Sequence, residues 1–231
     1  MTRDKFKTYG NVFDNYTNRN LFKLISEGMF EGIESPVSIG KEANIFTART
    51  KDKSRVVLKI YRLETCDFNR MFEYIRTDPR FSQIKKSKRK IIFEWAKREF
   101  TNLMKARELG IKVPRPLTIK DNIVVMEHIG GKETAPKLKD THDYDIDDAY
   151  NRVIAFMKKL HKGGLVHGDL SEYNILIHRK KPVFIDFSQT TSLRDPNARE
   201  WVERDAKNIA AFFMKKKIKT SADQILKSVM S

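Results

Sequence analysis

Two short apolar runs in the second half of the chain, each joined to polar side chains, constrain this sequence most. They are Leu165-Val-His-Gly-Asp-Leu-Ser-Glu-Tyr-Asn-Ile-Leu-Ile177 and Val183-Phe-Ile-Asp-Phe187. They place Asp169, Asn174 and Asp186 at the ends of predicted strands. Phosphoryl transfer from a nucleotide needs such a set, because one Asp orients the attacking oxygen while an Asn and a second Asp hold the metal ion that neutralises the phosphates.

The spacing of these residues matches a known catalytic pattern. Asp169 and Asn174 have the separation found in the H-R-D-x-x-x-x-N loop of protein kinases, with Gly168 at the Arg position. Asp186 then stands where a kinase carries the Asp of D-F-G. The competing interpretation is a β-hairpin with polar residues at its ends, so the rest of the chain has to decide between the two.

A nucleotide site also needs groups that contact the phosphates. Ser38-Ile-Gly-Lys-Glu-Ala-Asn44 precedes a predicted strand, where backbone amides and a Ser hydroxyl can bind phosphate oxygens. With one glycine it matches neither G-x-G-x-x-G nor the Walker A pattern. We therefore take Ser38, Gly40 and Lys41 as candidate ATP contacts on position alone.

Lys59 stands inside the apolar strand Val57-Leu-Lys-Ile60, where an ammonium group is unfavourable unless it meets an anion. In protein kinases a lysine at this place binds the α- and β-phosphates and pairs with a Glu on the next helix. Glu99 is the expected partner because it lies in mid-helix, whereas Glu94 lies nearer the start. The alternative is a strand lysine whose ammonium simply reaches solvent.

The segment Met126-Glu-His-Ile129 is expected to connect two lobes. Backbone N–H and C=O groups, chiefly at Glu127 and Ile129, are predicted to hydrogen-bond the edge of an adenine. Gly130 and Gly131 mark the boundary that follows.

Apolar spacing and turn residues predict the remaining elements. Pro36 and Gly40 are expected to bracket a turn, and the helix over residues 91–108 is expected to bury Ile92, Trp95, Phe100, Leu103 and Met104. The other predicted elements are a helix over 18–29, strands over 43–47 and 56–61, a loop over 77–90, a hairpin of 117–119 with 123–126, and helices over 147–162, from about 195 and from 221.

Composition fits a soluble globular protein. The 231 residues are 40% hydrophobic and 33% charged, with no run long enough to cross a membrane and no signal-peptide pattern, so we expect no membrane association and a cytoplasmic location. The single cysteine, Cys66, excludes an internal disulfide and is interpreted as a packing residue.

The formal charge of +16, from 46 Lys and Arg against 30 Asp and Glu, indicates a polyanionic partner. The densest basic runs lie at residues 85–90 and 215–219. Solvated surface lysines explain the same runs equally well.

The five histidines form no metal-binding pair with the cysteine, which argues against a zinc site. No G-x-S-x-G motif occurs, which argues against a hydrolase of that type. His167 is interpreted as a residue that orients the catalytic loop.

Taken together, these motifs resemble the first subfamily of the RIO family of atypical protein kinases. The resemblance covers nearly the whole chain. About 35 residues precede Ser38, too few for the N-terminal winged helix of the second subfamily. The sequence departs from the residues usual in the first subfamily at Ile39, where Thr is usual, and at Phe187, where Val is frequent. The motifs that carry the resemblance are Val12-Phe-Asp14, Ser38 to Asn44, Leu165 to Asn174, Ile185-Asp-Phe-Ser-Gln189, Asp195-Pro-Asn-Ala198 and Arg204-Asp205.

The resemblance implies an α+β, two-lobed protein-kinase-like fold without an activation loop, and no A-P-E motif follows Asp186. We expect a helical extension over 1–35 packed on the kinase domain, an N-lobe over 36–129 and a C-lobe over 130–231. The implied cofactors are ATP and Mg²⁺, with Mn²⁺ as a substitute. Asp169 would be catalytic, Asn174 and Asp186 would bind the metal, and Asp186 would accept phosphate as an aspartyl-phosphate.

The family also implies partners: the maturing small ribosomal subunit and its RNA, against which the positive charge would be useful. The protein substrate is not specified by the sequence. Two alternatives remain. One is a small-molecule kinase of the aminoglycoside or choline type, which shares H-G-D-x-x-x-x-N. The other is an RNA-binding assembly factor that uses ATP only as a conformational clamp.

Overall fold

The computed structural model describes residues 13–81 and 87–231, which form two compact units. The first unit takes in residues up to 72, the stretch from 84 to 100, and residues 115–128. The second takes in residues 73–83, 101–114 and 129–231. The chain makes its last passage between the units after His128, within the connector expected from the sequence.

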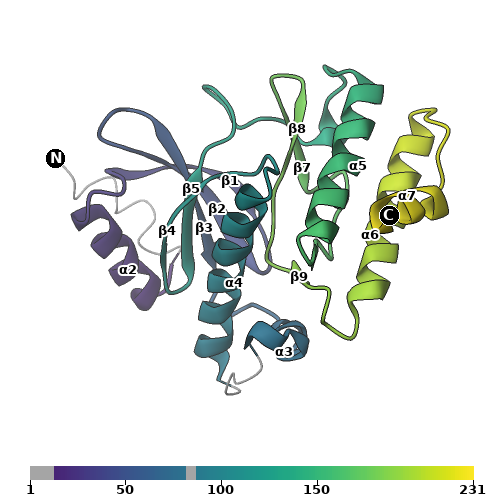
Figure 1. Cartoon of the computed structure of the whole chain (residues 1–231). Coiled ribbons are helices and arrows are strands. Elements are labelled where there is room, and N and C mark those ends of the chain that lie inside the picture. Colours follow the sequence, from purple (N-terminus) through teal and green to yellow (C-terminus); the bar gives the residue numbers. More distant parts are fainter. Residues whose placement is uncertain (1–12, 82–86) are drawn as a thin grey trace. The chain divides into compact units, whose positions relative to one another are not determined.

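The first unit is built on a five-stranded antiparallel sheet in the order β1-β2-β3-β5-β4 (Figure 1). The strands expected over 43–47 and 56–61 are present, as is the hairpin that turns through Asp121 and Asn122. The strands are β1 Gly32–Ile39, β2 Ala43–Arg49, β3 Arg55–Tyr61, β4 Pro116–Lys120 and β5 Ile123–Glu127.

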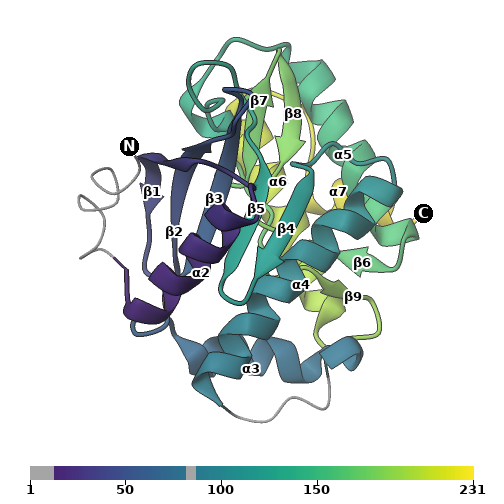
Figure 2. The same cartoon turned by 90° about the vertical axis from the view of Figure 1, so that its left-hand side faces the viewer.

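Helix α2, Asn15–Ser26, covers one face of this sheet, and Figure 2 shows it lying across β1, β2 and β3. It begins three residues before the predicted start because the Asp14 side chain accepts hydrogen bonds from the N–H groups of Tyr16 and Thr17 and caps the helix. The apolar core between helix and sheet comprises Leu21, Leu24, Phe30, Ile33, Phe46, Ala48, Val56, Leu58, Ile60, Ile123 and Val125.

Helix α4, Lys88–Glu108, contributes its first half to the first unit. Because side chains alternate along a strand, Lys59 points away from Leu58 and Ile60 and toward this helix, where it meets Glu99. Helices α2 and α4 therefore lie on opposite faces of the sheet.

The prediction that Met104 belongs to the core was wrong, because this side chain is 43% exposed. Ile92, Trp95 and Leu103 are buried as expected. Met104 follows Leu103 by one position, which rotates it about 100° around the helix axis, away from the buried stripe.

Two further expectations are corrected. Pro36 does not bracket a turn but lies within β1, and it is tolerated because β1 is an edge strand of the sheet. Part of the stretch 77–90 that was expected to be a loop is regular structure: α3, Phe68–Thr77, ends at its first residue, a 3₁₀ turn spans Pro79–Phe81, and α4 starts at Lys88. Residues 82–86 of that stretch lie outside the described residues.

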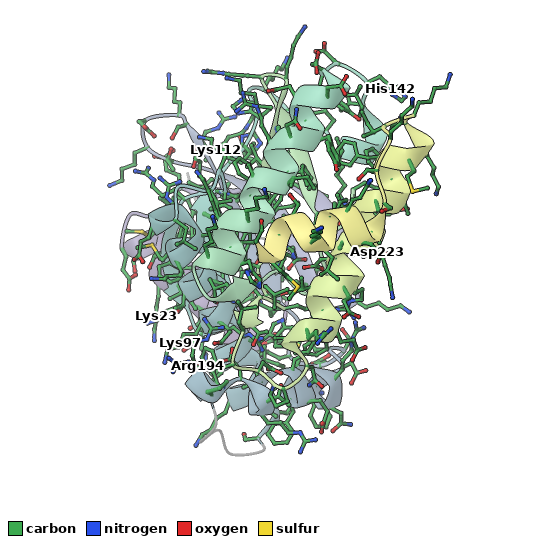
Figure 3. The ribbon with its side chains drawn as sticks, turned by 45° about the vertical axis from the view of Figure 1, so that its right-hand side comes forward. Lys23, Lys97, Lys112, His142, Arg194 and Asp223 are labelled. Atoms are coloured by element: carbon green, nitrogen blue, oxygen red, sulfur yellow. The ribbon has the colours of Figure 1, made fainter. Side chains whose placement is uncertain are left out.

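The second unit is mainly helical. Helix α5, Ile146–Lys162, is capped by Asp145, and α7, Ala222–Met230, is capped by Ser221, whose side chain accepts from the Gln224 N–H. Figure 3 shows His142 beside the end of α6, where its Nδ1 lies 3.2 Å from Lys216 Nζ. The elements are a 3₁₀ turn Leu138–Asp140, α5 Ile146–Lys162, β6 Leu165–Val166, β7 Ile175–His178, β8 Lys181–Phe184, β9 Thr191–Ser192, α6 Ala198–Lys215 and α7 Ala222–Met230.

Two small antiparallel pairs, β6 with β9 and β7 with β8, lie among these helices. The β7–β8 pair is the hairpin expected at the two apolar runs, with Ile175 opposite Phe184. This pairing brings Asn174, just before β7, close to Asp186, just after β8.

Cys66, in the first unit, is buried, and its thiol lies 2.7 Å from the Arg62 carbonyl oxygen. Burial raises the pKa of this thiol to about 11, so it stays neutral, in keeping with a packing residue rather than a nucleophile. Within residues 13–81 and 87–231, no helix combines the length and the apolar character needed to cross a membrane.

Candidate functional site: a phosphoryl-transfer loop and a buried lysine

Asp169 and Asn174, in the second unit, lie in contact within the loop that joins β6 to β7. The Asn174 side-chain amide donates to the Asp169 carbonyl oxygen at 2.8 Å and to Asp169 Oδ2 at 3.1 Å. A single side chain thus fixes both the backbone and the carboxylate of Asp169.

Asp186 is brought next to this pair by the β7–β8 hairpin, because the Ile185 N–H donates to the Asn174 carbonyl oxygen at 3.0 Å. Ser188 Oγ donates to Asp186 Oδ1 at 2.7 Å. Asp186 has a φ of 60°, in the left-handed region that residues other than glycine seldom occupy. The three residues expected to act on a metal–nucleotide complex therefore lie together.

These groups fit a magnesium ion. Carboxylate and amide oxygens are its preferred protein ligands, and Mg²⁺ usually takes its remaining ligands from substrate phosphates and water. The Asn174 amide nitrogen faces Asp169, so its oxygen is left for a cation, since it accepts no hydrogen bond within the part of the chain that the structure describes. That part contains no group of three or more His, Cys, Asp or Glu side chains placed to hold a metal, so the protein alone offers a sparse ligand set.

The backbone around Asp169 is held by Asp205 of α6. The Asp205 carboxylate accepts from the Gly168 N–H at 2.9 Å and from the Leu170 N–H at 2.8 Å, and Arg204 donates to the Gly168 carbonyl. Burial raises the pKa of Asp205 to about 7, against the two backbone hydrogen bonds that favour its charged form. Sequence analysis assigned Asp205 no role beyond its place in the Arg204-Asp205 motif.

Gly168 explains the departure from the H-R-D pattern. Its φ is 80°, and a Cβ at this position would lie 3.1 Å from the Gln189 carbonyl oxygen. A left-handed backbone with so close a neighbour favours glycine over the arginine of that pattern.

His167 makes contacts that fit the orienting role predicted for it. Its Nε2 lies 3.1 Å from the Ile185 carbonyl oxygen, and its ring packs edge-on against Phe187 with centroids 4.9 Å apart. The loop that carries Asp169 is thereby tied to the strand end that carries Asp186.

In the first unit, Lys59 and Glu99 form the ion pair expected from the sequence. Lys59 Nζ lies 2.8 Å from Glu99 Oε1, and the two side chains are 8% and 1% exposed. Tyr61, not identified from the sequence, donates to Glu99 Oε2 at 2.5 Å. Its position two residues after Lys59 on the same strand face was the available signal.

The segment from Ser38 to Asn44 comprises the end of β1, the turn over residues 40–42 and the start of β2. The Gly40 N–H donates to the Ala43 carbonyl oxygen at 3.1 Å, and a Cβ on Gly40 would lie 2.9 Å from that oxygen. Ser38 and Lys41 are exposed. The turn is therefore tight at its glycine and open at the two candidate phosphate contacts.

Each of two connector residues, Glu127 and Ile129, has one backbone group already bonded within the protein. The Glu127 N–H is already used, since it donates to the Arg115 carbonyl oxygen at 2.8 Å, so any adenine contact at this residue is left to its C=O. At Ile129 the opposite holds, because its C=O accepts from the Ala135 N–H at 2.8 Å and its N–H is the group that remains.

Comparison with known proteins identifies relatives over nearly the whole chain. The family model described as "RIO domain" matches residues 44–225. The RIO-type serine/threonine-protein kinase Rio1 of Methanocaldococcus jannaschii is 41% identical over 228 residues, which cover 98% of this chain and 78% of the relative. Rio1 of Haloferax volcanii is 38% identical over 227 residues, with the same coverage of 98% and 78%.

Among solved structures, the Rio2 kinase–ADP/Mg²⁺–phosphoaspartate complex from Chaetomium thermophilum superposes with a TM-score of 0.73 at 26% identity. The alignment covers 92% of this chain and 66% of that one. The α+β, protein-kinase-like fold expected from the sequence is therefore confirmed.

Proposed function

Because this chain belongs to the RIO family of serine/threonine-protein kinases, and so is a phosphotransferase, we propose that the Asp169–Asn174–Asp186 cluster carries its ATP- and Mg²⁺-dependent chemistry. The proposal rests on the two bonds that Asn174 makes. Its side-chain amide donates to Asp169, and its backbone carbonyl accepts from the N–H of the residue before Asp186.

Each residue of the cluster has a separate part. Asp169, oriented by Asn174, accepts the proton of the attacking hydroxyl or water. Asn174 and Asp186 would hold Mg²⁺, which when bound neutralises the charge on the phosphates. Mn²⁺ has the same preference for oxygen ligands and is expected to replace it.

In the first unit, the Lys59 ammonium is proposed to bind phosphate oxygens of ATP while Glu99 and Tyr61 hold it in place. Ser38, Gly40 and Lys41 are proposed as further phosphate contacts. The Glu127 C=O and the Ile129 N–H offer the acceptor and donor that an adenine edge requires.

We further propose that Asp186 accepts phosphate transiently. A carboxylate oxygen of Asp186 attacks the γ-phosphorus, the bond to the bridging oxygen of the β-phosphate breaks, and ADP leaves with that electron pair. Water then hydrolyses the acyl phosphate and releases inorganic phosphate. Support comes from the phosphoaspartate named in the Chaetomium thermophilum Rio2 complex.

The cellular role is proposed to be maturation of the small ribosomal subunit in the cytoplasm. The formal charge of +16 favours contact with ribosomal RNA. Catalysis by the RIO domain is preferred over an ATP clamp without turnover because all three cluster residues are present, with Asn174 bonded to Asp169 and to the residue before Asp186.

The test is ATP turnover by Asp169→Asn and Asp186→Asn, with Asp148→Asn as the control for loss of an exposed carboxylate in the same unit. Both cluster variants should lose turnover at least a hundredfold, and Asp169→Asn should still bind nucleotide. Unchanged hydrolysis by Asp169→Asn would reject its assignment.

Two further measurements separate the finer alternatives. Label from γ-³²P-ATP should remain on the protein in a hydroxylamine-sensitive form, and Asp186→Asn should abolish it. Turnover stimulated by pre-ribosomal particles supports the ribosomal role, whereas stimulation by small alcohols or aminoglycosides supports a small-molecule kinase.

A further inference from the structure

The Asn102 side chain, on the second half of α4, is completely buried in the second unit and uses both ends of its amide. Its Nδ2 donates to the Phe187 carbonyl oxygen at 2.9 Å and to the Thr190 carbonyl oxygen at 2.7 Å. Its Oδ1 accepts from Arg80 Nη1 at 2.8 Å. Neither end of the amide can turn without breaking a buried hydrogen bond.

The two carbonyls that Asn102 binds belong to the turn immediately after Asp186. The Thr190 N–H donates to the Phe187 carbonyl oxygen at 3.2 Å and closes this turn. Asp186 itself is left-handed, with a φ of 60°. A residue with a Cβ holds such a conformation only where its surroundings fix the chain on both sides.

The chain is fixed before Asp186 by the Ile185 N–H, which donates to the Asn174 carbonyl oxygen at 3.0 Å. After Asp186, the bonds from Asn102 fix it. Asn102 is therefore the side chain that completes the restraint on the Asp186 backbone.

Arg80 in turn sets the orientation of the Asn102 amide. Its guanidinium binds the buried Asp78 carboxylate through Nη2 at 2.7 Å and Nε at 3.0 Å, and it reaches the Thr190 carbonyl oxygen at 3.3 Å. Asp78 also accepts from Thr191 Oγ1 at 3.1 Å. The planar, forked guanidinium makes these contacts at once, which a lysine ammonium cannot do.

We infer that Asn102 and Arg80 are positioning residues for Asp186, holding the turn after it so that its carboxylate is presented to the metal ion. This rests on the proposed metal-binding role of Asp186. In protein kinases the corresponding Asp must be in place before catalysis, and the activation loop controls this. Within the described residues, α6 starts at Ala198, soon after Asp186, so no activation loop lies between them, and the Asp78–Arg80–Asn102 network supplies a permanent restraint instead.

Asn102→Asp is the sharpest test. The carboxylate has nearly the same shape and can still accept from Arg80, but it cannot donate to the Phe187 and Thr190 carbonyls. Arg80→Met is the second variant: it keeps the apolar stem of a side chain that is 30% exposed but leaves the buried Asp78 carboxylate without its cation, so its melting temperature is recorded beside its kinetics. Arg199→Met, on an exposed ion pair of α6, is the control.

Three quantities should be measured for each folded variant: kcat, the Mg²⁺ concentration for half-maximal turnover, and the Kd for ADP in EDTA. Asn102→Asp should lower kcat at least tenfold and raise the required Mg²⁺ at least fivefold, with the Kd for ADP in EDTA changed less than twofold. Arg80→Met should shift the same two quantities by a smaller factor, Arg80→Lys should not restore them, and Arg199→Met should match the wild type.

A merely structural role predicts a different result, namely a lower melting temperature with an unchanged Mg²⁺ requirement, and that result in both Asn102→Asp and Arg80→Met would overturn the inference. Asp186→Asn is measured in parallel, through the Mg²⁺ concentration that produces half of the metal-dependent gain in ADP affinity, because its turnover is expected to be lost. If Asp186→Asn raises the Mg²⁺ requirement and the two positioning variants do not, this inference fails alone. If Asp186→Asn leaves the requirement unchanged, the proposed metal role and this inference fail together.

Discussion

The Lys59 ammonium lies 2.8 Å from the Glu99 carboxylate inside the first unit, and both side chains are buried. Changing Glu99 to Gln leaves a buried charge without its counter-charge, which destabilises proteins by about 3–5 kcal/mol. We predict a loss of unfolding free energy of that order and a weaker affinity for ATP, measured by denaturant unfolding and by nucleotide titration.

The matched control is Glu108→Gln, which removes the partner of Lys105 from an exposed pair on the same helix. This variant should behave as the wild type in both measurements. Wild-type stability of Glu99→Gln would mean that the buried pair contributes nothing.

Tyr61→Phe removes the hydroxyl that donates to Glu99 Oε2 and leaves the ion pair in place. A hydrogen bond to a charged group contributes about 1.5–3 kcal/mol, so the loss of stability should be smaller than that of Glu99→Gln. ATP affinity should fall only modestly. A double-mutant cycle of Tyr61→Phe with Glu99→Gln should show coupling, and strict additivity would show that the hydroxyl acts independently of the carboxylate.

The raised pKa of Asp205 predicts that the free energy of unfolding depends on pH. Its pKa is raised from 3.8 to about 7 in the folded protein, so between these values the folded state binds more protons than the unfolded state. The stabilisation is complete below about pH 4 and is lost as the pH rises toward 7, by an amount on the order of a few kcal/mol. The difference in unfolding free energy between wild type and Asp205→Asn should therefore shrink or reverse across this window. A constant difference from pH 4 to 7 contradicts the prediction.

Gly40→Ala tests the turn between β1 and β2. The added Cβ would lie 2.9 Å from the Ala43 carbonyl oxygen, so the turn must shift. We predict weaker ATP binding, by about threefold or more, with little change in melting temperature. Gly32→Ala is the control because a Cβ there meets nothing within 4 Å. Equal affinities for the two variants would argue against a role of this turn in binding phosphate.

The residues that sequence analysis located well are those whose chemistry conflicts with their local setting. Lys59 is a cation in an apolar strand, and its pairing with Glu99 followed from that conflict. Asp169 and Asn174 were recognisable because five positions separate them within one loop, and they contact each other within that loop.

The residues that it missed depend on contacts between segments far apart in the chain. In the sequence, Asn102 is indistinguishable from an ordinary polar residue of an amphipathic helix. Only the fold places its side chain against the carbonyl oxygens of Phe187 and Thr190. Asp78 and Arg80 flank a proline in a stretch without apolar periodicity, so a loop was the natural prediction. Their pairing is visible only once the 3₁₀ turn over Pro79–Phe81 is known.

The position of Pro36 within β1 has a consequence for how the protein behaves in a crowded solution. β1 ends the sheet on one side, and its register shifts twice against β2, between Ile33 and Ser35 and between Pro36 and Ser38. A proline offers no N–H to an incoming strand, and the irregular register breaks the straight row of donors and acceptors that such a strand would need. Both features disfavour pairing of the β1 edge with a strand of another molecule, and so disfavour edge-to-edge aggregation.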